Sequence, residues 1–279
     1  MSFKESDFKK FNHFNVKSIG GEVGVVHVEI NRPKVFNSMS EETWTQYGAI
    51  INKLNTLNDV NVIVLSGTGK HFCAGIDLKA SANSFQQYSQ KGGESKGLQH
   101  VSDFQNDIKS GVDGRIPIIC VIHGVCYGLG LDLISATSIR FASKDSRLSI
   151  KEIDIGIMAD IGSLERLPFL VNNISKLNQY ALTAQEFNGQ DAKDLGLVSD
   201  VFANKEEAFE NAVRLAKTIA TKYPPAVHGT KKNLDLVTIN SESVIKGLDQ
   251  VAHDNVKLMT DPGFAKFFIK SQQKRKSKM

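Results

Sequence analysis

Runs of apolar residues predict a buried sheet in the first half of the chain. Residues 61–66 (NVIVLS) and 116–123 (IPIICVIH) are almost continuously apolar, which is typical of strands covered on both faces. Two segments rich in strand-forming residues, 14–19 and 23–31, flank Gly20-Gly21 and predict a hairpin before them. Three further short strands are predicted at 139–142, 147–150 and 197–202.

Amphipathic segments predict helices between the strands and, after residue 171, over most of the remaining chain. In the first part they cover 40–57, 98–112, 128–137 and a short helix that begins at Asp160 or Ile161 and ends at Pro168. In the second part they cover 175–182, 189–195, 205–222, 224–237, 241–258 and 262–271. This order predicts an α/β core with crossover connections, followed by a helical C-terminal region.

The polar segment 81–97 interrupts this pattern. It is rich in glycine, serine and glutamine, and we expect a mobile helix and loop that gates a substrate site. The whole pattern divides the chain into an N-terminal extension, an α/β core, a helical C-terminal region and a basic tail, at 1–13, 14–200, 201–271 and 272–279.

Composition narrows the function classes. The 279 residues are 41% hydrophobic and 23% charged, as in ordinary globular proteins. A net charge of +4, much of it in the tail KSQQKRKSKM, is too small to indicate nucleic-acid binding but suits an anionic ligand. No apolar run approaches the roughly 20 residues of a membrane span, and residues 1–16 contain no apolar signal-peptide core. Cys73, Cys120 and Cys126 lack metal-ligand spacing and predict buried, reduced thiols in an intracellular protein.

Three carboxylates, Asp132, Glu152 and Asp160, lie in the apolar stretch 118–168. Charges in such surroundings are costly unless they are paired or used chemically. Each also has a simpler interpretation when taken alone. Asp132 fits a first-turn helix acid, Glu152 an exposed acid at the end of a strand, and Asp160 an N-cap.

Two glycine-rich turns each follow a buried strand. The first is Ala74-Gly75-Ile76-Asp77, and the second, 124–132, opens a helix. A turn that enters a helix leaves backbone N–H groups free, so one donor from the first turn and one from Leu129 or Gly130 could form an oxyanion hole for an enolate. The simpler interpretation is a pair of tight strand-to-helix turns.

Other kinds of site are disfavoured. Leu133 stands where a dinucleotide-binding GxGxxG motif needs its third glycine. His123 and His253 have no partner at metal-ligand spacing, so we expect structural histidines and no metal site. The nucleophile motif GxSxG is absent from the sequence.

The segments 72–78 and 123–133 resemble the enoyl-CoA hydratase/isomerase (crotonase) superfamily. Further similarity lies at Asn31-Arg32-Pro33 with Asn37, at 183–192 and at 196–198. The segment 151–168 is most similar to Δ3,5-Δ2,4-dienoyl-CoA isomerases. Hydratases of the superfamily carry glutamates at the positions of Asp132 and Glu152, and glycine where this chain has Asp160. Leu129 replaces the usual middle glycine of the second turn.

The resemblance implies a crotonase-like spiral of ββα units whose helical C-terminal region mediates trimerisation. It implies a substrate that is a 3,5-dienoyl-CoA thioester, with Asp160 as the base at C2, Glu152 as the acid at C6 and Asp132 as a third acid. The implied oxyanion and substrate-binding residues are Ala74, Gly75, Ile76, Asp77, Leu78, Leu129 and Gly130. Lys79 is a candidate for the coenzyme A phosphates, and no separate cofactor is expected. The expected assembly is a homotrimer or a hexamer.

Two alternatives remain open at this point. One is a hydratase or a Δ3-Δ2-enoyl-CoA isomerase. The other is a non-catalytic member of the same fold that binds acyl-CoA or RNA. Retention of three acids and both glycine turns argues against the second.

The tail ends Ser277-Lys278-Met279, close to the S-K-L peroxisomal signal, and predicts recognition by a peroxisomal import receptor. Glu5 and Asp7 argue against an N-terminal transit segment. We therefore expect the peroxisomal matrix, with mitochondrion or cytoplasm as alternatives.

Overall fold

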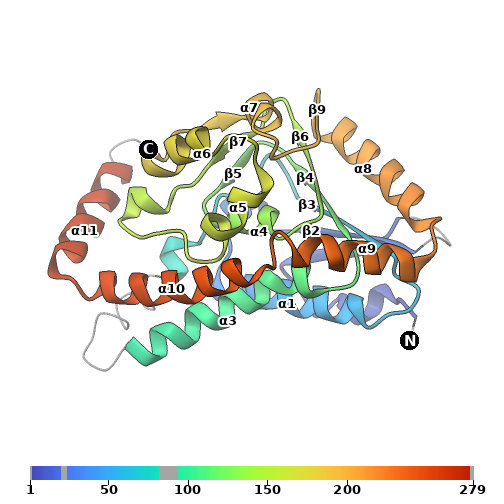
Figure 1. Cartoon of the computed structure of the whole chain (residues 1–279), viewed down its shortest axis with the longest axis horizontal. Helices are drawn as coiled ribbons and strands as arrows, with labels where there is room; N and C mark the ends of the chain where they lie inside the picture. Colours follow the sequence, from blue (N-terminus) through green and yellow to red (C-terminus); the bar gives the residue numbers. More distant parts are fainter. Residues whose placement is uncertain (1, 20–23, 82–93, 277–279) are drawn as a thin grey trace.

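The computed structural model describes residues 2–19, 24–81 and 94–276 (Figure 1). Most of the expected hairpin loop, most of the expected gating segment 81–97 and the Ser277-Lys278-Met279 signal lie outside these residues. The described ends of the gating segment are helical. Residues 78–81 are helical up to the limit of this described range, and residues 94–97 belong to α3 (Glu94–Asp113).

Six strands form the main sheet in the order β1-β2-β3-β4-β6-β9. Its strands are β1 (Phe14–Ser18), β2 (Val25–Ile30), β3 (Val62–Gly67), β4 (Ile118–Ile122), β6 (Ile139–Ser143) and β9 (Asp200–Phe202). The β1–β2 pair is antiparallel and every other pair is parallel. All residues of β3 and β4 are buried, as their continuous apolar sequences predicted.

A second, three-stranded sheet contains β5 (Val125–Tyr127), β7 (Arg147–Ser149) and β8 (Phe187–Asn188). From β4 to β7 the chain alternates between the two sheets. Strands β4 and β6 belong to the six-stranded sheet, and β5 and β7 belong to the three-stranded sheet. Each of these strand pairs then leads toward a helix, α4 (Leu129–Ser135) or α5 (Ser163–Leu170). This repetition confirms the predicted spiral of ββα units. The sequence did not predict β5 and β8, which have only three and two residues.

Helices cover both faces of the main sheet. On one face, α1 (Glu41–Asn55) packs against α3, and α3 in turn packs against α10 (Glu242–Met259). On the other face, α8 (Lys205–Ala220) presents Ala208, Ala212 and Ala216 to the strands. Phe8 and Phe11 are buried in the main core, so the expected N-terminal extension packs on the fold.

The C-terminal helices wrap around the core (Figure 1). From α8, the chain passes through α9 (Pro224–Leu236) and α10 to α11 (Pro262–Lys276) at the opposite end of the molecule. There α11 contacts the 3₁₀-helix η4 (Glu152–Ile155). Residues 272–276 of the expected tail continue α11 as helix. In the described ranges, no helix is both long and apolar enough to cross a bilayer.

The remaining elements are short. They are η1 (Glu5–Phe8), η3 (Pro33–Val35), α6 (Ile174–Thr183) and α7 (Gly189–Asp194). The prediction that Pro168 ends its helix was wrong, because α5 continues to Leu170. Proline lacks the backbone N–H and crowds one carbonyl of the preceding turn. Because Pro168 lies two residues before the end of α5, it disturbs few of the helical hydrogen bonds.

Candidate active site

A cavity of about 660 Å³ lies where the two glycine turns, η4, α3 and α11 meet. Most of its wall is apolar, with Ile153, Ile155 and Ile157 from the η4 region and Val101 and Phe104 from α3. The polar groups that line it include Asp132, Glu152, Asp160, Lys151 and Lys270. An apolar cavity with a few convergent polar groups is the usual form of a small-molecule site.

The backbone of the first glycine turn is fixed by hydrogen bonds to Met39. Met39 pairs with Ile76 as an isolated parallel bridge. The Met39 N–H donates to the Gly75 carbonyl at 2.9 Å, and the Asp77 N–H donates to the Met39 carbonyl at 2.8 Å. Within the described chain, the Ile76 N–H between these bonds has no hydrogen-bond partner. Ile76 lines the cavity, so this donor is available to a ligand.

The second turn lies beside the first. Cys73 and Cys126 form a parallel bridge, and a Cβ at Gly75 would stand 3.0 Å from the Tyr127 carbonyl oxygen and 3.9 Å from the Leu129 nitrogen. This approach, with a φ of +95° at Gly75, requires glycine. Leu129 begins α4, where N–H groups lack helical acceptors.

Leu129 and Gly130 differ in their position relative to the cavity, and this difference favours Leu129 as the second oxyanion donor. Leu129 lines the cavity, but Gly130 does not. A Cβ at Gly130 would lie 3.1 Å from both the Cys126 sulfur and the Cys73 carbonyl oxygen, so Gly130 packs into the protein. All three cysteines are buried and free, as predicted.

Asp132 lies in α4 with 1% of its surface exposed. Its Oδ1 accepts the Ser163 N–H at 2.7 Å, at the start of α5. Burial raises the pKa of Asp132 to about 6, although the Ser163 hydrogen bonds and the nearby Arg166 charge favour the ionised form. Asp132 therefore links the second glycine turn to the helix that follows the Asp160 loop.

Glu152 begins η4 and does not end a strand, because β7 stops at Ser149. A Cβ at Gly128 would be 2.9 Å from Glu152 Oε1, so this carboxyl lies against the second glycine turn. Its Oε2 is shielded from solvent and has no hydrogen-bond partner. Burial, and then the charges of Asp132 and Asp160, raise the pKa of Glu152 well above its usual range.

Asp160 is not an N-cap, because α5 begins at Ser163 with Gly162 as its cap. Its Oδ2 accepts the Asn255 amide at 2.7 Å, and its backbone carbonyl accepts the Gln105 amide at 2.7 Å. Burial raises the pKa of Asp160 to about 7; the Asn255 hydrogen bond lowers it, and the Asp132 charge raises it. Asn255 and Gln105 were missed in the sequence, since they lie on α10 and α3, far from Asp160 along the chain.

The other expected site residues are more scattered. Ala74, Gly75 and Leu78 line the cavity. Asp77 does not; it pairs with Arg32 at 3.2 Å. Lys79 is exposed and lies outside the lining, which instead includes Lys151 and Lys270. Over the described ranges, no three histidine, cysteine or acidic side chains are grouped so that they could hold a metal ion.

Comparisons with known proteins identify relatives of this chain. The sequence profile of the enoyl-CoA hydratase/isomerase family matches residues 20–263. A peroxisomal Δ(3,5)-Δ(2,4)-dienoyl-CoA isomerase of Arabidopsis thaliana is 40% identical over 256 residues, covering 90% of this chain and 91% of the relative. A mitochondrial Δ(3,5)-Δ(2,4)-dienoyl-CoA isomerase of Mus musculus is 33% identical over 272 residues, covering 96% and 82%.

Solved structures show the same fold. An enoyl-CoA hydratase/isomerase from Mycobacterium paratuberculosis superposes with a TM-score of 0.80 over 92% of this chain and 98% of that one, at 21% identity. The resemblance found in the sequence is thus confirmed by a family profile, by relatives matched over most of their length and by the fold. The chain belongs to the enoyl-CoA hydratase/isomerase family.

Proposed function

We propose that this protein is a Δ3,5-Δ2,4-dienoyl-CoA isomerase, which converts a 3,5-dienoyl-CoA thioester to the conjugated 2,4-diene. The observation that carries the proposal is the presence of three carboxylates, Asp132, Glu152 and Asp160, in the lining of one cavity with two glycine turns. The names of the two relatives described above support the same reaction.

The reaction moves one proton out at C2 and one in at C6. The N–H groups of Ile76 and Leu129 bind the thioester oxygen and stabilise the enolate that forms when the C2–H bond breaks. The released electron pair forms the C2=C3 bond, the C3=C4 π electrons move to form the C4=C5 bond, and the C5=C6 π electrons form a C–H bond with the proton delivered at C6. The product has double bonds at C2 and C4, and no atom is gained or lost.

The two proton-transfer roles need carboxyls in opposite ionisation states. Asp160, with a pKa of about 7, is substantially ionised at neutral pH and serves as the base at C2. Glu152, whose pKa lies well above its usual range, stays protonated and serves as the acid at C6. Their shared charge environment makes the carboxyls titrate as a coupled set. Asp132 supplies a second negative charge beside that of Asp160, and it orients the start of α5 through Ser163.

One spectrophotometric experiment tests the function. Purified protein is mixed with a 3,5-dienoyl-CoA, and the ultraviolet absorbance of the 2,4-dienoyl product is followed. Hydration of a 2-enoyl-CoA and conversion of a 3-enoyl-CoA are measured in parallel. We expect turnover of the 3,5-diene to exceed both. A faster reaction with the 2-enoyl substrate would instead identify a hydratase, and binding of acyl-CoA without any turnover would identify a non-catalytic member.

Coenzyme A enters this proposal as part of the substrate, and the reaction uses no separate cofactor. Lys151 and Lys270 border the cavity and are better placed than Lys79 to meet the phosphates. Substituting each of the three lysines by methionine and measuring KM for the acyl-CoA distinguishes them.

The proposed assembly is a homotrimer or hexamer built through the helical C-terminal region. Large apolar side chains exposed on α9, α10 and α11 support it: Leu234, Leu236, Ile245, Phe267 and Ile269. Light scattering coupled to size exclusion measures the mass, and a monomer would contradict the proposal.

The proposed compartment is the peroxisomal matrix, which the name of the plant relative supports, whereas the mouse relative is named mitochondrial. Imaging of an N-terminally tagged chain, with and without Ser277-Lys278-Met279, tests the compartment and the import receptor together. Unchanged localisation after removal of the three residues would contradict receptor recognition.

A further inference from the structure

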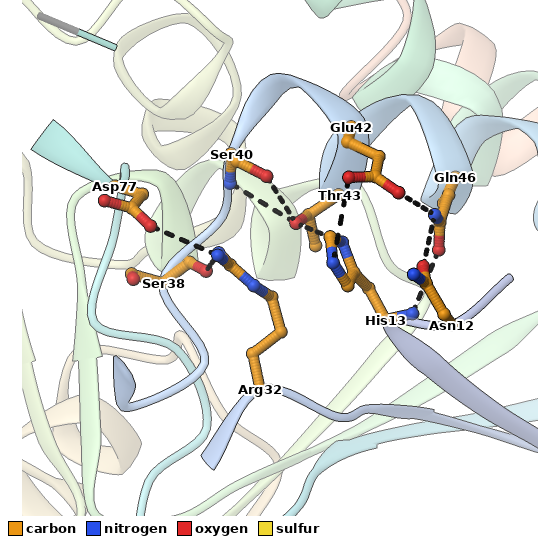
Figure 2. A network of polar contacts seen from close by, with 9 residues as sticks. All are labelled: Asn12, His13, Arg32, Ser38, Ser40, Glu42, Thr43, Gln46 and Asp77. Atoms are coloured by element: carbon orange, nitrogen blue, oxygen red, sulfur yellow. Dashed lines mark hydrogen bonds and ion pairs between the residues drawn. The ribbon is translucent and has the colours of Figure 1, made fainter. Parts of the chain in front are cut away.

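Two groups of polar contacts lie on either side of Met39, one around Arg32 and the first glycine turn and one at the start of α1 (Figure 2). In the first group, Arg32 follows β2, and its guanidinium donates to the Ser38 carbonyl and to Asp77 Oδ2, the second contact at 3.2 Å. Asp77 follows Ile76 directly, and its Oδ1 also accepts the Ala80 N–H at 3.3 Å. The side chains of Arg32 and Asp77 are 18% and 16% exposed, so solvent screens this ion pair only in part.

Asn37 fixes the same segment from a second side. It is fully buried, and its amide nitrogen donates to the carbonyls of Thr68 and His71 at 2.9 and 2.7 Å. Its Oδ1 accepts the Arg32 N–H at 2.8 Å. Asn37 has a φ of +56°, a left-handed conformation that asparagine tolerates better than most residues. The chain between Arg32 and Ser40 therefore forms hydrogen bonds both to the residues that follow β3 and to the first glycine turn.

Met39 connects this segment to the Ile76 N–H, the proposed oxyanion donor. Its N–H and carbonyl bond to the peptides on either side of Ile76, and its neighbour Ser38 is held by Arg32. Ser40 then starts α1, where its N–H donates to Thr43 Oγ1 at 3.3 Å, and Thr43 in turn bonds to His13 at 2.9 Å (Figure 2). The direction of the Ile76 N–H is thus set by groups that do not line the cavity.

We propose that Arg32 and Asp77 are positioning residues for the reaction, because their ion pair fixes the direction of the Ile76 N–H toward the thioester oxygen. This inference rests on the proposed function. Arg32 and Asp77 lie 45 positions apart in the chain, and the inference assigns both of them the role of orienting the Ile76 N–H. Misplacement of a donor by about 1 Å can cost about two orders of magnitude in rate, so a geometric role predicts a large kinetic effect.

The test compares Arg32→Lys, Arg32→Ala and Asp77→Asn with the wild-type protein. We expect kcat to fall about ten-fold for Arg32→Lys and Asp77→Asn and about 100-fold for Arg32→Ala, with KM changing less than about three-fold. Lysine keeps the charge but not the planar fork of arginine. The double variant Arg32→Lys/Asp77→Asn should be no slower than the slower single variant, because both substitutions break one interaction.

A second readout separates positioning from general stability. Polarisation of the thioester carbonyl shifts the ultraviolet absorbance of bound 2,4-dienoyl-CoA to longer wavelength, and we expect this shift to shrink in each variant. Asp200→Asn is the matched control, since Asp200 pairs with Lys193 at 2.9 Å between α7 and β9, outside the cavity lining. Its kcat and absorbance shift should equal those of the wild type.

Wild-type kcat or a wild-type absorbance shift in folded Arg32→Lys and Asp77→Asn would overturn the inference, even if both variants melt at lower temperature. If Arg32→Ala fails to fold, the two conservative variants carry the test. A wild-type protein that does not convert 3,5-dienoyl-CoA would refute the proposed function. The absorbance shift of bound 2,4-dienoyl-CoA would still report whether Arg32 orients the Ile76 donor.

Discussion

The cavity obtains its polar groups from two sources. The acid cluster, Asp132, Glu152 and Asp160, consists of side chains that reach into apolar surroundings. The two glycine turns, 74–77 and 124–132, contribute main-chain N–H groups instead. An acid can be removed by an isosteric substitution that leaves the chain path intact, whereas an amide donor can be moved only by altering that path. Kinetic variants should therefore affect the two regions in different ways.

The largest effect is expected for Asp160→Asn. This change keeps the size of the side chain and a partner for Asn255, but it removes the base that takes the C2 proton. Loss of a general base typically costs about 10²–10⁴-fold, and we expect kcat for 3,5-dienoyl-CoA to fall by about 10³. Formation of the 2,4-diene measures kcat, and circular dichroism checks the fold. A folded variant with wild-type kcat would remove Asp160 from the mechanism.

Glu152→Gln should follow, with a loss of about 10² in kcat, because the acid at C6 is removed. Glutamine cannot deliver the proton, but it is uncharged like the protonated carboxyl that the raised pKa of Glu152 favours. Incubation in deuterated water provides an independent measurement. The variant should still exchange C2 protons of the substrate through Asp160 while forming little 2,4-diene. Equal loss of exchange and of product would contradict separate roles for the two acids.

Gly128→Ala tests the place where the two regions touch. The residue has a φ of +52°, and the new Cβ would meet Glu152 Oε1 at 2.9 Å. We expect about a ten-fold loss in kcat, and a destabilisation of about 1–2 kcal/mol from the left-handed backbone. Thermal melting gives the second quantity. An active and equally stable variant would show that the second turn tolerates a side chain there.

Asp132→Asn should move the pH profile more than the maximal rate. The Asp132 charge raises the pKa of Asp160, so its removal lowers that pKa and keeps the base ionised at lower pH. The acidic limb of kcat/KM, centred near pH 7 in the wild type, should shift down by up to about one pH unit. A shift upward, or none, would mean that Asp132 carries no charge in the active enzyme.

The smallest effect is expected for Leu129→Met. The substitution keeps the N–H of residue 129 and nearly conserves volume, so kcat should stay within about three-fold of wild type and stability within about 1.5 kcal/mol. Parallel assays with Glu152→Gln sharpen the contrast between the acid cluster and the glycine turns. A loss for Leu129→Met as large as for Glu152→Gln would show that the leucine side chain itself takes part.

The sequence predicts the strands of the main sheet well where the physical signal is local. Continuous apolar runs at β3 and β4 reflect burial on both faces, and the second glycine turn follows the end of β4 closely. The short β5 lacks such a signal, because three residues beside a glycine turn form a strand only through their partners in β7. Glu152 was expected to end a strand, but β7 stops at Ser149, and two residues separate it from η4, where Glu152 lies.

The site shows the same division. Three acids in an apolar stretch are visible in the sequence, because charge in such surroundings is unusual. The partners that hold them are not visible, since Asn255 reaches Asp160 from α10 and Arg32 reaches Asp77 from the end of β2. Contacts between distant segments leave no periodicity or spacing in the chain. Gly130 was expected as an alternative oxyanion donor. The structure shows that it packs against Cys73 and Cys126 in the protein interior, a contact that the sequence alone does not reveal.

The main-chain origin of the Ile76 and Leu129 donors has a consequence for inheritance. Of the encoded amino acids, proline alone lacks the required hydrogen, so other replacements at either position retain it. Descendants of this gene can therefore diverge at these two sites while keeping the enolate-stabilising chemistry, provided that the folded course of the polypeptide is maintained. Selection at these positions acts on conformation and only weakly on the identity of the encoded residue.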